Sequence, residues 1–152
     1  MIRRLLFAAI LATTALPAMA VDTSSGRTAQ TNYILKCVGC HGVDGHGFSE
    51  VGIPDFVNLI GTFAGDEAGR AYLANVPNVV GSGLNEDDVA EVLNFIIARW
   101  AGSSLPEDYR PFDGAEVARL HALDVGNIVD YRRVVAARLA DLGIETAEYP
   151  WP

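Results

Sequence analysis

The chain has 152 residues, of which 50% are hydrophobic and 20% are charged, and its formal net charge at pH 7 is −8. This length allows one small domain, and the acidic balance excludes nucleic acid as a partner because phosphate binding needs clustered positive charge. A protein partner with a basic surface patch fits better, since complementary charge speeds the encounter of two proteins. Acidity that only keeps the chain soluble is the alternative.

Residues 1–20 have the pattern of a secretory signal peptide. Arg3 and Arg4 precede an apolar run over residues 5–16, and residues 18–20 (Ala-Met-Ala) supply the small residues of a cleavage site. The run is shorter than the roughly 20 residues that cross a bilayer. We therefore expect export to a bacterial periplasm and no stable membrane insertion after cleavage, with an uncleaved anchor as the alternative. Cleavage would change the net charge from −8 to about −10.

A predicted helix over residues 28–36 leads into the run Cys37-Val38-Gly39-Cys40-His41, which contains both cysteines of the chain. Two cysteines three residues apart, followed directly by a histidine, form the attachment signature for a c-type haem. Each thiol would add across one vinyl group of the porphyrin, and His41 would bind the iron as the proximal ligand. We expect one covalent haem c per chain.

Three other uses of a cysteine pair are a disulfide, a thioredoxin-like redox pair and half of a zinc site. Zinc would need further thiolate or imidazole ligands, and only His46 and His121 remain outside the motif. A redox pair is typical of a strand-helix-strand pattern, which this sequence lacks. The haem hypothesis is therefore favoured.

The segment after the motif, residues 42–66, is rich in glycine and predicts an irregular loop, which a bound cofactor would explain. A short helix is predicted over residues 66–74. The strongest helix is predicted over residues 86–101, where apolar residues recur every third or fourth position. Asn85 is suited to cap its start and Gly102 to end it.

Residues 103–111 predict a linker, and two further helices are expected beyond it. Asp113 and Glu116 predict a capping box at the start of the first. The second is predicted over residues 127–142, and its expected apolar stripe consists of Ile128, Tyr131, Val135, Leu139 and Leu142. The aromatic tail, residues 149–152, is expected to be a packed strap or a docking element. No alternating strand pattern occurs, so the predicted fold class is all-α.

These features resemble a class I c-type cytochrome over residues 27–100. The matching parts are the helix before the motif, the glycine-rich run 42–47, Pro54 and the helix over residues 86–101. The resemblance implies a cytochrome c-like helical domain around a covalent haem, with the haem edge exposed and the carbonyl near Pro54 orienting His41. We accordingly divide the chain into a signal peptide (1–20), a cytochrome c domain (21–102) and a C-terminal helical extension (103–152), which lies outside the resemblance.

The chain departs from this family at the sixth iron ligand, which is usually a methionine in the loop before the last core helix. Here that loop, residues 75–83, contains none, and Met1 and Met19 both lie in the signal peptide. Imidazole binds iron more strongly than an amide does. The candidates for the distal side are His121 or Asn78, with Asn75, His46, water or no ligand as further alternatives.

The resemblance implies a periplasmic electron-transfer protein that is not itself an enzyme. Its redox partners would be proteins such as a periplasmic dehydrogenase or a terminal oxidase, and it could also sit permanently beside a catalytic partner. An open or weakly occupied sixth site would instead favour binding of diatomic gases or reaction with peroxide. No Ser/His/Asp set, carboxylate pair or phosphate-binding loop indicates a conventional enzyme.

Overall fold

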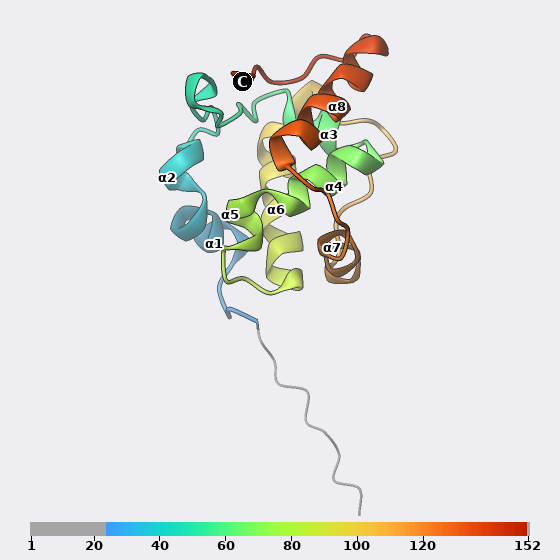
Figure 1. Cartoon of the computed structure of the whole chain (residues 1–152). Coiled ribbons are helices and arrows are strands. Elements are labelled where there is room, and N and C mark those ends of the chain that lie inside the picture. Colours follow the sequence, from blue (N-terminus) through green and yellow to red (C-terminus); the bar gives the residue numbers. More distant parts are fainter. Residues whose placement is uncertain (1–23, 152) are drawn as a thin grey trace, which may run out of the picture.

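The computed structural model describes residues 24–151, and these residues are mostly helical (Figure 1). No strand occurs among them, and their only β feature is an isolated bridge between Phe48 and Ile53. The all-α prediction is therefore confirmed for this part of the chain. The predicted signal peptide lies outside the described residues. Within residues 24–151 no helix is both long and apolar enough to cross a membrane.

Residues 24–151 form eight α-helices and two 3-10 helices. In chain order they are α1 (Ala29–Lys36), α2 (Val38–His41), η1 (Ser49–Val51), α3 (Ile60–Ala64), α4 (Glu67–Asn75), α5 (Pro77–Val80), α6 (Glu86–Trp100), η2 (Gly102–Ser104), α7 (Gly114–His121) and α8 (Ile128–Asp141).

Helices α1 and α6 lie close to their predicted ranges, and they pack on each other. Thr28 caps α1 by accepting a hydrogen bond from the Thr31 amide at 3.2 Å, and Asn85 caps α6 by accepting one from the Asp88 amide at 2.7 Å. The helices meet where the rings of Tyr33 and Trp100 lie 5.0 Å apart. The apolar stripe of α6 is buried over its whole length: Val89, Val92, Leu93, Ile96, Ile97 and Trp100.

The C-terminal helices share the core of the preceding residues. α7 packs on α4 and α6, and α8 packs on α4. Their buried apolar residues belong to the same cluster as those of α6. A buried ion pair also joins α4 to α7, because the Arg70 guanidinium donates to both carboxylate oxygens of Glu116 at 2.8 and 2.6 Å. Residues 24–151 therefore enclose one continuous core.

Two local predictions for the extension are wrong. Asp113 does cap α7, but the Glu116 carboxylate does not return to the helix start, because it binds Arg70 and Arg110 instead. The capping box is thus only half formed. Leu142 is 66% exposed because α8 ends one residue earlier, whereas Arg132, which the stripe did not include, is buried.

Candidate cofactor site

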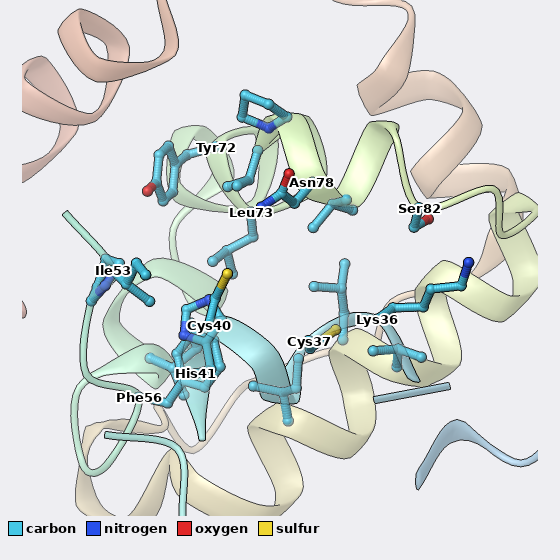
Figure 2. A pocket seen from close by; sticks show the side chains of 18 of the residues that line it. Lys36, Cys37, Cys40, His41, Ile53, Phe56, Tyr72, Leu73, Asn78 and Ser82 are labelled. Carbon is cyan, nitrogen blue, oxygen red and sulfur yellow. The ribbon is translucent and has the colours of Figure 1, made fainter. Parts of the chain in front are cut away.

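One cavity of about 340 Å³ lies between α2, the loop 52–56, α4, α5 and α6 (Figure 2). Its volume falls within the roughly 300–1,000 Å³ of small-molecule and cofactor sites. Most of the wall is apolar, with Leu73 and Val76 on one side and the buried stripe of α6 on another. The polar side chains at its surface are few: Lys36, His41, Tyr72, Asn78, Ser82 and Tyr149.

The motif forms one short turn beside this cavity. The His41 amide donates to the Cys37 carbonyl at 2.9 Å, and Gly42, with a φ of 72°, ends the turn. The Tyr33 hydroxyl donates to the Gly42 carbonyl at 2.7 Å, which ties this turn to α1. Cys37, Cys40 and His41 all line the cavity, and Figure 2 shows the three side chains on one wall. The five residues 37–41 thus present both thiols and one imidazole to the same space.

The His41 imidazole is held in one orientation by its neighbours. Its ring stacks on Phe56 with centroids 4.0 Å apart and an interplanar angle of 17°. Its Nδ1 atom is buried and makes no hydrogen bond, although the Pro54 backbone lies close enough to affect its pKa. Burial lowers the pKa of His41 to about 4, and the Pro54 carbonyl opposes only part of that shift. The ring is therefore neutral at pH 7, which is the form that binds a metal.

The two thiols do not form a disulfide and lack the electrostatics of a redox pair. Both cysteines are free and partly buried. Burial and then the charge of Cys40 raise the pKa of Cys37 to about 11, whereas reactive cysteine pairs have lowered pKa values. Within residues 24–151 no three His, Cys, Asp or Glu side chains gather as a protein-only zinc site would require. Among the described residues this cysteine pair is therefore neither a disulfide nor an activated thiol pair.

Of the four distal candidates, the structure brings only Asn78 to the cavity. Figure 2 shows Asn78 across the cavity from α2. The Nε2 atom of His121 lies 3.1 Å from the Ala74 carbonyl, outside the cavity wall. The remaining two are also engaged elsewhere: the Asn75 amide donates to the carbonyls of Ala71 and Leu120, and the exposed His46 lies 2.9 Å from Asp55.

Sequence reasoning missed the contribution of the C-terminal segment to the cavity. Ile128 and Val129 of α8 and Tyr149 of the tail belong to its wall, together with Tyr72 of α4. The aromatic composition of the tail was a signal that it packs, but nothing in the sequence indicated against what. The tail reaches the cavity wall because the fold brings it next to the loop after α2, although these two segments are far apart in the sequence.

The residues present fit a haem. The cavity is mostly apolar, its wall carries both attachment thiols, and a neutral imidazole stands beside them. No model of a known protein family matches the sequence, and no curated protein matches it. What the chain binds is therefore inferred from the residues that line this cavity.

Proposed function

We propose that this chain is a mono-haem c-type cytochrome that carries electrons in the periplasm. Cys37 and Cys40 would hold one haem c through thioether bonds, and His41 would be the proximal iron ligand. One observation carries this proposal: all three side chains of the attachment signature converge on one wall of an apolar cavity of cofactor size. When bound, haem supplies an iron whose oxidation state can change by one electron, at a potential set by its ligands and surroundings.

The chain's own residues prepare this site in three ways. The turn over residues 37–41 fixes the thiols relative to the imidazole, so little freedom is lost on attachment. Phe56 holds the plane of the His41 ring. The apolar wall excludes water, and a dry environment favours the less charged state of a metal centre.

A small acidic protein of this kind is suited to brief encounters with a basic partner. Its formal net charge is −8, and it would be about −10 without the signal peptide. Ile34 and Leu35, which precede the motif on α1, are both more than half exposed. Such charge steers association, and a small apolar area can make the contact. Periplasmic dehydrogenases and terminal oxidases are partners of the required chemistry.

One observation favours a second candidate function, which is the binding of diatomic gases. Val76 and the first three residues of α5 line the cavity, and of these four residues only Asn78 carries a polar side chain. A side-chain amide is a weak iron ligand, so O₂, CO or NO could take its place. Optical spectra of the ferrous protein with and without CO separate the two functions. Asn78→Ala should increase CO affinity severalfold if the amide is a weak ligand, and His121→Ala should leave the spectra unchanged.

The primary function is tested by haem attachment. The full chain is produced in a bacterial periplasm together with a cytochrome c maturation system, and the purified protein is analysed by mass spectrometry under denaturing conditions. We expect a mass increase of one haem that Cys37→Ala and Cys40→Ala each reduce, while the control His46→Ala retains it. A wild-type chain that is folded and exported but carries no covalent haem would refute the proposal.

A further inference from the structure

The C-terminal segment lines part of the cavity wall with Ile128, Val129 and Tyr149. Figure 1 shows the chain leaving α8 and running back toward the loop that follows α2. There the Tyr149 ring packs on Gly52, where an added Cβ would lie 3.2 Å from the tyrosine hydroxyl. Ala147, two residues before Tyr149, is also buried. The tail is therefore a packed strap beside the cavity. This was one of the two possibilities that the sequence left for it.

Directly behind this wall lies Arg132 of α8, which is 2% exposed. Its guanidinium carbon lies 5.3 Å from the ring centroid of Tyr72 and 5.0 Å from that of Tyr149, the two tyrosines that line the cavity. Phe63 and Trp151 complete the aromatic surroundings at 4.7 and 6.0 Å. The positive charge of Arg132 therefore lies next to the rings of Tyr72 and Tyr149, on the side away from the cavity.

The charge of Arg132 is not neutralised by any side chain in the described part of the molecule. Its Nη2 atom donates to the Ala147 carbonyl at 2.9 Å, the guanidinium also interacts with the neutral Tyr72 hydroxyl, and its Nε has no hydrogen-bond partner. No Asp or Glu within residues 24–151 forms an ion pair with it. A buried charge without a counter-charge is costly, and contacts with aromatic faces offset only part of that cost. The site is therefore electrostatically suited to an anion.

The tyrosines lie at one particular end of the cavity. Figure 2 shows Tyr72 near Ile53, at the end away from Lys36 and Ser82. Burial raises the pKa of the Tyr72 hydroxyl, the nearby Arg132 guanidinium opposes this rise, and Tyr149 lies close enough to add to it. A carboxylate at this end could accept hydrogen bonds from both hydroxyls while facing a buried guanidinium.

We propose that Tyr72 and Tyr149, backed by Arg132, form a carboxylate-binding end of the cavity that receives a propionate group of the haem. This inference rests on the proposed function, since it takes haem as the occupant. It gives the C-terminal extension a specific role: α8 and the tail complete the cofactor site and supply its counter-charge. Arg132 is a positioning residue, and the two tyrosines make the contact.

The test measures the midpoint reduction potential of the haem-loaded protein against pH, in wild type and in Tyr72→Phe and Tyr149→Phe. These variants remove a hydroxyl and keep the ring, so the packing around Arg132 survives even where a change of Arg132 itself would prevent folding. The control is Tyr131→Phe, which removes a hydroxyl from the neighbouring residue of α8, outside the cavity wall.

Hydrogen bonds to a propionate favour its ionised form and lower its pKa. We therefore expect the propionate-linked step in the potential to move to higher pH by about one unit in each cavity variant, and to stay in place in Tyr131→Phe. A step that stays at the wild-type pH in both cavity variants would overturn the proposal. Mass spectrometry of each sample comes first, because a wild-type protein without covalent haem would refute the proposed function itself and is distinguished in this way.

Discussion

Two buried arginines fasten the C-terminal extension to the rest of the molecule, and they do so in opposite ways. Arg70 on α4 is 4% exposed and forms two hydrogen bonds with the Glu116 carboxylate of α7. Arg132 on α8 is as deeply buried, but aromatic rings surround it and no carboxylate in the described residues pairs with it. Only the second arginine lies behind the cavity wall.

This difference between the two arginines indicates different roles, one in stability and one in binding. The charge of Arg70 is balanced within the chain, so its role is complete in the protein alone. The described side chains supply no counter-charge for Arg132, and an isolated buried ion is strongly unfavourable. The cavity next to it is where such a counter-charge can enter. Changes at the first arginine should therefore affect stability, and changes around the second should affect the cofactor.

The largest effect is expected from Glu116→Gln, which leaves the buried Arg70 without its counter-charge. Removal of one partner from a buried ion pair costs about 3–5 kcal/mol of unfolding free energy. Urea denaturation at pH 7 measures this loss. The matched control is Glu67→Gln, an exposed carboxylate on α4, which should change stability by less than about 0.5 kcal/mol. Equal stability of the two variants would show that the ion pair between Arg70 and Glu116 does not stabilise the fold.

The same pair should make stability depend on pH. Burial alone would raise the pKa of Glu116, but hydrogen bonds from Arg70 and Arg110 outweigh it and lower the pKa from 4.5 to about 2. A lowered folded-state pKa contributes stability that is complete above about pH 5 and is lost as the pH falls toward 2, and here it amounts to roughly 3 kcal/mol. Urea midpoints measured between pH 6 and pH 3 should fall more steeply for wild type than for Glu116→Gln. Parallel curves would show that the carboxylate is not held in this way.

A smaller effect is expected at the contact between the tail and the loop. Gly52 has a φ of 82°, and Gly52→Ala would both strain this backbone and push Tyr149 away. Gly126→Ala is the control, since Gly126 has a φ of 60° but open space around its Cα. Both should lose about 1–2 kcal/mol of unfolding free energy. Only Gly52→Ala should also expose the tail to limited proteolysis, and equal cleavage in both would mean that the tail does not depend on this contact.

The sequence allowed the helices with strong local signals to be predicted, and it marked one wall of the site. Asn85 and Asp113 cap the helices that they were expected to cap, because a cap depends on residues three positions apart. The side chains of Cys37, Cys40 and His41 share one wall because their spacing forces them into one turn. Local spacing is enough to decide such features.

What could not be predicted depends on contacts between distant residues. Glu116 has the position of a capping-box residue, yet its partner Arg70 lies 46 positions away. Arg132 looks like a surface residue of an amphipathic helix, but Phe63, Tyr72 and the aromatic tail surround it and bury it. The sequence left both His121 and Asn78 as leading distal candidates, since the course of the chain determines that Asn78 and not His121 reaches the cavity.

The most direct measurement is a crystal structure of the haem-loaded full chain. We predict thioether bonds from Cys37 and Cys40, iron bound by His41, and a propionate within hydrogen-bond distance of the Tyr72 or Tyr149 hydroxyl. Haem bound with its propionates directed to solvent, away from Arg132, would contradict the role given to the extension. A cavity without haem in a protein that was matured beside a haem-attachment system would contradict the whole account.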